Sequence, residues 1–128
     1  MKIVLDTHIV VHAARDELDP ERKVLLEDAS NALFVSAVTL WEITKLVELG
    51  RLEMPDGPGP FLSALCDHPR FAIHQYDAAL MMELLAVAPK FRGDPADQII
   101  VATTRSLSAS LVTKDSRLRD YPHIRTAW

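Results

Sequence analysis

Four acidic residues stand where a carboxylate could take part in chemistry: Asp6, Glu42, Asp97 and Asp115. Two of them follow short apolar runs that predict buried strands, and two lie within stretches that predict helices. Oxygen ligands without histidine or cysteine suit Mg²⁺ or Mn²⁺ rather than zinc. If the fold gathers these carboxylates, the pattern predicts a divalent metal site whose oxygens lie close enough to hold one ion.

Glu42 carries the clearest individual signal. It lies four residues after Val38, four before Leu46 and seven before Leu49, on the apolar face of a helix expected over residues 37–49. An unpaired carboxylate on a buried face is costly or becomes neutral. The structural alternative is a salt bridge to Lys45, which contributes only about 0.2–0.5 kcal/mol. We therefore interpret Glu42 as a functional acid that points into a cleft.

Asp97 gives a similar signal in a later helix. It shares a helical face with Ile100, Val101 and Thr104, which places a carboxylate on the buried side. Its position in the first turn also suits the helix dipole, which is the structural alternative. Asp94 precedes a proline and is expected to cap the helix. We interpret Asp97 as functional and Asp94 as a cap or a supporting residue.

The two acids at strand ends are ambiguous when taken singly. Asp6 could cap the helix that follows it, and Asp115 could cap or turn the segment after residue 115. Thr7 and Thr113 would lie beside them. Ligand sites in open parallel sheets lie just beyond the carboxyl ends of the strands. Because all four acids occupy positions that can converge on such a crevice, we favour a shared site.

The elements that must position these residues alternate along the chain. Strands are expected over 1–5, 33–35, 71–73 and 110–113, with a weak edge strand over 124–127. Helices are expected over 7–15, 20–29, 37–49, 61–67, 78–86 and 95–107; residues 54–60 and 88–93 are expected to be loops, the latter polar and basic, and 114–120 a polar turn or short helix. In the helix over 78–86, four residues are expected to face inward: Leu80, Met81, Leu84 and Leu85. This order predicts a three-layer α/β/α domain with a mostly parallel sheet of four to five strands.

Composition narrows the class of protein. The 128 residues are enough for one domain, expected to span residues 1–128, and the 48% hydrophobic and 25% charged residues are typical of a globular protein. No apolar run approaches the roughly 20 residues that span a bilayer, and no secretory signal is present at the start. Cys66 is the only cysteine, which favours a reducing cytoplasm. The net charge of -4 is unfavourable for nucleic acid, but acids that surround a cation do not repel a phosphate.

Four segments, taken in order, resemble a PIN-domain ribonuclease, specifically the VapC-type toxin of a bacterial or archaeal toxin–antitoxin pair. They are Leu5-Asp6-Thr7, Ser36 with Trp41-Glu42-Ile43, Asp94 to Thr103, and Leu111 to Asp115. The resemblance covers the whole chain, and the length is that of one such domain. Gln98 is a departure, because this subgroup often has arginine there.

The resemblance implies the roles of the site residues. Asp6, Glu42, Asp97 and Asp115 match the acidic quartet of the family as catalytic and metal-binding residues, with Asp115 the most variable position. Thr7 and Thr113 match the hydroxyl residues beside the quartet. One or two Mg²⁺ or Mn²⁺ ions would then activate a water for in-line attack on an RNA phosphodiester and leave a 5′-phosphate and a 3′-hydroxyl.

The resemblance also implies partners. RNA would approach over four basic residues in loops near the crevice: Lys90, Arg92, Lys114 and Arg117. A VapB-like antitoxin would bind a groove formed by apolar residues of the first two helices, with Ile9, Val10 and Leu26 as candidates that could otherwise complete the core. A homodimer in a prokaryotic cytoplasm is expected, and the RNA target is left open.

Alternative readings fit less well. A response-regulator receiver needs two adjacent acids after the first strand, but Thr7 and His8 follow Asp6. A haloacid-dehalogenase-like phosphatase needs an aspartate where His8 stands. His8 and His12 have the spacing of a zinc peptidase motif, but Ile9 occupies the place of its glutamate. A non-catalytic PIN-like binding module stays open, although an intact quartet favours catalysis.

Overall fold

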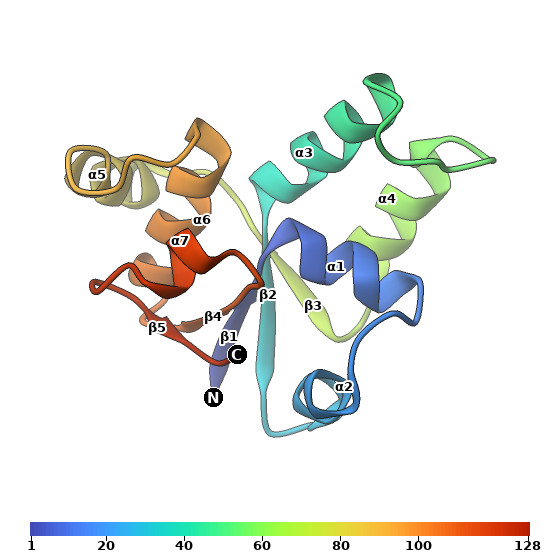
Figure 1. The fold of residues 1–128 in the computed structure, drawn as a ribbon, viewed down its shortest axis with the longest axis horizontal. Coiled ribbons are helices and arrows are strands. Elements are labelled where there is room, and N and C mark those ends of the chain that lie inside the picture. Colours follow the sequence, from blue (N-terminus) through green and yellow to red (C-terminus); the bar gives the residue numbers. More distant parts are fainter.

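The structure, a computed structural model, describes residues 1–128 and consists of alternating strands and helices (Figure 1). The strands are β1 (Lys2–Leu5), β2 (Ala32–Ser36), β3 (Phe71–His74), β4 (Ser110–Val112) and β5 (Arg125–Thr126). The helices are α1 (Thr7–Ala14), α2 (Pro20–Glu27), α3 (Ala37–Glu48), α4 (Pro58–Asp67), α5 (Ala78–Val87), α6 (Pro95–Ser106) and α7 (Ser116–Arg119). Every predicted strand is present, and the weak edge strand is β5.

The five strands form one parallel sheet in the order β3-β2-β1-β4-β5. The central strand β1 pairs with β2 on one side and with β4 on the other, so that Ile3 lies opposite both Leu33 and Ser110. A crevice is expected where connections leave neighbouring strands in opposite directions. The predicted α/β sheet is confirmed. Its strand order differs from the 2-1-3-4-5 order of receiver domains, which removes that alternative.

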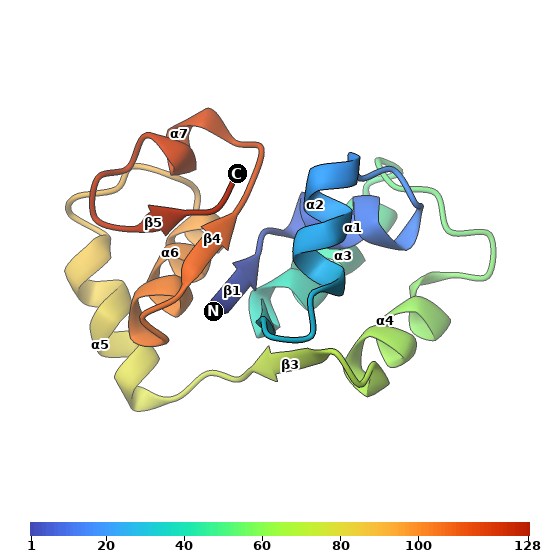
Figure 2. The same ribbon diagram turned by 90° about the horizontal axis from the view of Figure 1, so that it is seen from below.

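Helices cover both faces of the sheet and complete three layers (Figures 1 and 2). Successive side chains of a strand point to opposite faces. Accordingly Val4 packs in a core with residues of α5, α6 and α7, whereas Ile3 and Leu5 pack in a second core with residues of α1. Helix α3 contributes to both cores, through Val38 and Ile43 respectively. It therefore starts at the boundary between the two halves of the molecule.

Most of the helices begin where they were expected, and side chains cap their first turns. Asp19 accepts a hydrogen bond from the backbone N–H of Arg22, and Asp77 does the same for Leu80. Ser36 caps α3, and Gly50, with φ of 69°, follows the end of that helix. These local signals fix where α3 begins and hence where Glu42 lies.

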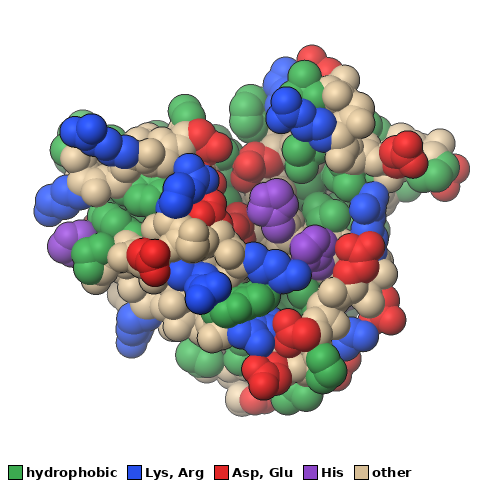
Figure 3. Space-filling view, in the orientation of Figure 1, with side chains coloured by type: hydrophobic (Ala, Val, Ile, Leu, Met, Phe, Trp, Pro, Cys, Tyr) green, Lys and Arg blue, Asp and Glu red, His purple; other side chains and the backbone are tan.

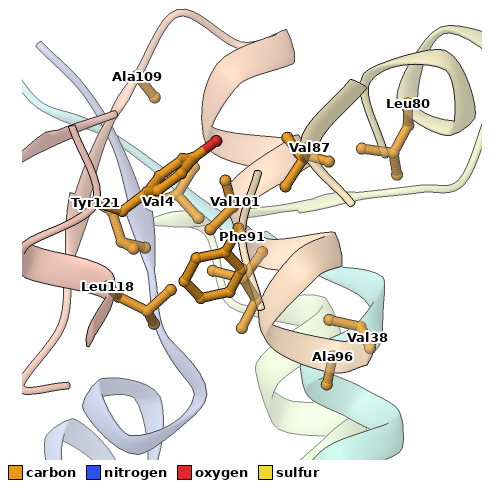
Figure 4. Close-up of a cluster of buried hydrophobic side chains, with 13 residues drawn as sticks. Val4, Val38, Leu80, Val87, Phe91, Ala96, Val101, Ala109, Leu118 and Tyr121 are labelled. Carbon is orange, nitrogen blue, oxygen red and sulfur yellow. The ribbon is translucent and has the colours of Figure 1, made fainter. Parts of the chain in front are cut away.

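One predicted helix boundary and two predictions about packing are wrong. Helix α4 starts at Pro58, within the expected loop, because proline is well suited to the first turn of a helix. In α5, Met81 and Leu85 are 40% and 66% exposed, although both were expected to face inward. Phe91, expected in a polar loop, is buried and packs edge-on against Tyr121 with ring centroids 5.2 Å apart (Figure 4).

No helix is both long and apolar enough to cross a membrane.

Candidate active site

Asp6 ties the carboxyl ends of β1 and β4 together. Its side chain is buried, with one oxygen accepting from the backbone N–H of Thr7 and the other from the Thr113 hydroxyl at 2.6 Å. The Thr113 hydroxyl in turn accepts from the backbone N–H of Asp115 at 3.0 Å. Asp6 is thus the N-cap of α1, as the structural alternative predicted, but its second oxygen is turned toward β4.

Glu42 lies beside Thr7, the residue that follows Asp6. Its Oε1 accepts a 2.6 Å hydrogen bond from the Thr7 hydroxyl, so α3 is linked to the start of α1. The ion pair considered as an alternative is not formed, because Lys45 binds Glu48 instead, with Nζ to Oε2 at 2.8 Å. Glu42 is therefore a half-buried carboxylate without a cationic partner.

Asp97 and Asp115 share one arginine. Arg117 Nη2 lies 3.2 Å from Asp97 Oδ2 and 2.7 Å from Asp115 Oδ2. Asp94 caps α6 as predicted, accepting from the backbone N–H of Asp97 at 2.8 Å. Arg117 was expected to face RNA, but it is engaged with the acids. Its place two residues after Asp115, at the start of a helical turn, is a sequence signal that could have indicated the pairing with Asp115.

Electrostatics show that these acids are neighbours. The pKa of Asp97 is raised to about 7. Burial is the largest cause, followed by the negative charges of Asp94, Asp6 and Glu42, while Arg117 lowers the pKa. Carboxylates from separate segments of the chain therefore share one electrostatic environment.

The other acids respond to the same surroundings. Burial raises the pKa of Glu42, with a further increase from the charge of Asp6, against the Thr7 hydrogen bond. Burial likewise raises the pKa of Asp6, although its hydrogen bond from Thr113 acts in the opposite direction. The pKa of Asp115 is lowered, chiefly by its hydrogen bond from Arg117. Asp115 is the one carboxylate of the four that a cation already stabilises strongly.

The donor set has the chemistry of a site for a hard divalent cation, since it consists of carboxylate and hydroxyl oxygens. However, no three of the Asp, Glu, His or Cys side chains converge closely enough to hold an ion as they are placed. The expected convergence on a single point is not seen, and every one of the four carboxylates is instead bound by a protein donor. Thr113 binds Asp6, Thr7 binds Glu42, and Arg117 binds the remaining two.

Basic and histidine side chains surround the acids. On the face viewed in Figure 3, acidic side chains and two histidines lie near the middle, where the halves of the molecule meet, with Lys and Arg around them. His8 is exposed, and its charge acts to lower the pKa of Asp6 and Glu42, so it lies close to both. Lys114 Nζ lies 3.3 Å from His12 Nδ1. Exposed histidine and lysine side chains therefore flank the acids.

Comparison with known proteins identifies the class. The sequence profile of the PIN domain matches residues 3–124, so the chain belongs to the PIN domain family. The family resemblance and the α/β/α fold predicted from the sequence are thereby confirmed.

A curated relative and two solved structures narrow the comparison. The chain is 31% identical to Ribonuclease VapC22 of Mycobacterium tuberculosis, over 98% of each sequence. Its fold is similar to VapBC2 of Rickettsia felis bound to a promoter DNA fragment, with a TM-score of 0.77, 17% identity and coverage of 99% and 98% of the two chains. It is also similar to DNA-bound VapBC of Salmonella typhimurium, with a TM-score of 0.78, 19% identity and coverage of 99% and 97%.

Proposed function

We propose that this protein is a divalent-metal-dependent endoribonuclease that acts as the toxin of a type II toxin–antitoxin pair. The observation that carries the proposal is that hydrogen bonds bring Asp6 and Glu42 to the same residue, Thr7, and that their negative charges raise the pKa of Asp97 on α6. Structural ion pairs also perturb pKa values, but here like charges are kept together at the carboxyl end of a parallel sheet. The similarity to a ribonuclease over nearly the whole chain supports the same reaction.

The acids, the two threonines and Arg117 have different roles in the proposed reaction. Asp6, Glu42, Asp97 and Asp115 would hold Mg²⁺ or Mn²⁺, with Asp94 supporting Asp97. A bound cation would supply activation of a water and neutralisation of charge on the phosphodiester. Thr7 and Thr113 hold two of the carboxylates in place through 2.6 Å hydrogen bonds. Arg117 must leave at least one of its two acids when a cation binds, because both would be ligands.

Amide variants of the buried acids test the catalytic assignment. We expect Asp6→Asn and Asp97→Asn to abolish metal-dependent RNA cleavage while the protein stays folded, and we expect Asp67→Asn, at an exposed acid at the end of α4, to keep full activity. Cleavage is measured on total RNA by sequencing the 5′-phosphorylated ends, with circular dichroism as the folding control. Full activity in both buried variants contradicts the proposal. An inactive wild-type protein that binds RNA would favour the non-catalytic binding module.

RNA is expected to reach the crevice over Lys114 and the loop that carries Lys90 and Arg92, all of which are exposed. With Arg117 held by the acids, these three are the remaining candidates for contact with RNA phosphates. Phosphate contacts of this kind make affinity depend on salt concentration. The RNA substrate and the single unpaired cysteine are consistent with a prokaryotic cytoplasm.

An antitoxin segment would bind in the apolar hollows between α1, α2 and α4. One hollow of about 370 Å³ is lined by Leu26 and Phe71, and another of about 300 Å³ is lined by Val10 and Phe61. Ile9 is fully buried and completes the core, so it drops out of the predicted groove. The structures similar in fold include VapBC complexes, which supports this partner.

A binding assay tests the groove. Leu26→Asp should weaken copurification with the product of the neighbouring reading frame at least tenfold, because it places a charge in the hollow. Val24→Asp, on the same helix but 67% exposed, should leave binding unchanged. Equal binding by both variants contradicts this location.

A second copy of the chain would cover the exposed apolar side of α5. Met82 and Leu85 are 65% and 66% exposed; Tyr76, two residues before α5, is 50% exposed and lines a hollow with Trp41, which is 56% exposed. Apolar side chains exposed together mark interaction surfaces. Light scattering of the wild type should give a dimer and that of Leu85→Glu a monomer. A monomeric wild type contradicts the homodimer.

A further inference from the structure

The hydroxyl of Thr39 has an unusual partner for a helical threonine. Thr39 is fully buried in the first turn of α3, one turn before Glu42. Its Oγ1 lies 3.0 Å from the Thr7 Oγ1 on α1, and Thr7 Oγ1 lies 2.6 Å from Glu42 Oε1. Thr44, Thr103 and Thr104 instead bond to carbonyls of their own helices. Thr39 therefore joins two helices at the candidate active site.

The number of protons determines the direction of these hydrogen bonds. Each hydroxyl has one proton to donate, and an ionised carboxylate only accepts. Thr7 must therefore donate to Glu42, which leaves its oxygen free to accept from Thr39. The result is a directed chain in which Thr39 donates to Thr7 and Thr7 donates to Glu42. Hydrogen bonds in such a chain polarise and strengthen one another.

We propose that Thr39 is a positioning residue that orients the Thr7 hydroxyl and, through it, fixes the Glu42 carboxylate for binding a divalent cation. The proposal rests on the proposed function, since Glu42 has this role only in a metal-dependent nuclease. Packing alone does not require a hydroxyl here, because valine has nearly the same shape and buries no polar atom. Partners that orient a ligand are worth about 10–100-fold in metal affinity when they contact it directly.

The test measures Mn²⁺ binding by calorimetry on the full chain. Because Thr39 acts through one intervening residue, Thr39→Val should raise the Mn²⁺ dissociation constant about fivefold to tenfold, at or below the low end of the range for partners in direct contact. Thr39→Ser, which keeps the hydroxyl, should stay within about twofold of the wild type. Thr44→Val is the matched control, since it removes an exposed hydroxyl from the same helix, and should bind Mn²⁺ normally. Thr39→Ala replaces the valine variant if the latter does not fold.

A kinetic measurement separates positioning from packing. The Thr39→Val variant should need more Mn²⁺ for half-maximal cleavage, and saturating Mn²⁺ should restore most of the maximal rate. Unchanged Mn²⁺ binding by Thr39→Val overturns the proposal, and so does an equal loss in Thr39→Ser, which would indicate packing. A wild-type protein that neither binds Mn²⁺ nor cleaves RNA overturns the proposed function and the role of Thr39 with it. Unchanged binding in the variant beside an active wild type overturns the role of Thr39 alone.

Discussion

Replacing Asp97 with asparagine should abolish cleavage and also stabilise the metal-free protein at pH 8. The pKa of this carboxyl is raised from 3.8 to about 7 by burial and neighbouring negative charges. A pKa difference of about 3 corresponds to roughly 4 kcal/mol. The raised pKa already includes the attraction of Arg117; because solvent around that exposed side chain screens charge at the site, we expect a net gain of only about 2 kcal/mol. Asparagine has the same shape and removes the charge.

The sign of the pH dependence follows from linkage. Since the folded state binds the proton more tightly than the unfolded state, the charge destabilises the protein fully above pH 7 and progressively less as the pH falls toward 3.8. The free energy of unfolding of the Asp97→Asn variant should therefore exceed that of the wild type by about 2 kcal/mol at pH 8, and the two values should match near pH 4. Ligand binding adds to the stability of the folded state, so Mn²⁺ should reduce the difference in stability between the variant and the wild type by stabilising only the wild type.

Urea denaturation in EDTA at pH 8, 6 and 4 measures the free energies of unfolding. Asp67→Asn, at an exposed acid, is the control and should change little at any pH. A variant that is no more stable than the wild type at pH 8 would refute the reasoning. A difference that persists unchanged at pH 4 would also refute it, because the carboxyl would then not be its source.

Two further substitutions test other parts of the site. Gly93→Ala should lower the free energy of unfolding in urea by about 1–3 kcal/mol, because a methyl group there would lie 2.7 Å from Cζ of the Phe91 ring. Gly59→Ala is the control, since open space surrounds that glycine, and it should not destabilise the fold. Equal stability of the two variants contradicts this packing. Arg117→Ala should tighten Mn²⁺ binding roughly fivefold in calorimetry, because two acids lose the cation that competes for them. Arg119→Ala, on the same short helix, should bind as the wild type, and weaker binding by Arg117→Ala would show that the arginine assists the site instead.

The fold and the grouping of the acids were predictable because they depend on local signals. Apolar runs ending at Asp6 and near Asp115 marked strand ends, and Asp94 marked a helix start, each within a residue or two. The apolar stripe around Glu42 located the functional face of α3. In a parallel sheet such positions meet at one edge by geometry alone.

The contacts missed by the sequence are not local. Arg117 reaches Asp97, 20 residues earlier in the chain, and no pattern around Arg117 encodes that distance in space. Met81 and Leu85 lie on a helix that is apolar on all sides, so periodicity could not distinguish the core side from the exposed side. The partner of Thr39 also lies on another helix, which only the assembled fold shows.

The hydrogen bond between Thr113 and Asp6 joins residues 107 positions apart in the chain. The ribosome makes β1 early and β4 only near the end of the described domain, so a nascent chain carries Asp6 for on the order of ten seconds before Thr113 and Asp115 exist. During translation the crevice lacks one wall until almost the whole domain has been synthesised. An enzyme that cuts the RNA of its own cell would thus be harmless while unfinished, and a protein that neutralises it would have that interval in which to assemble nearby.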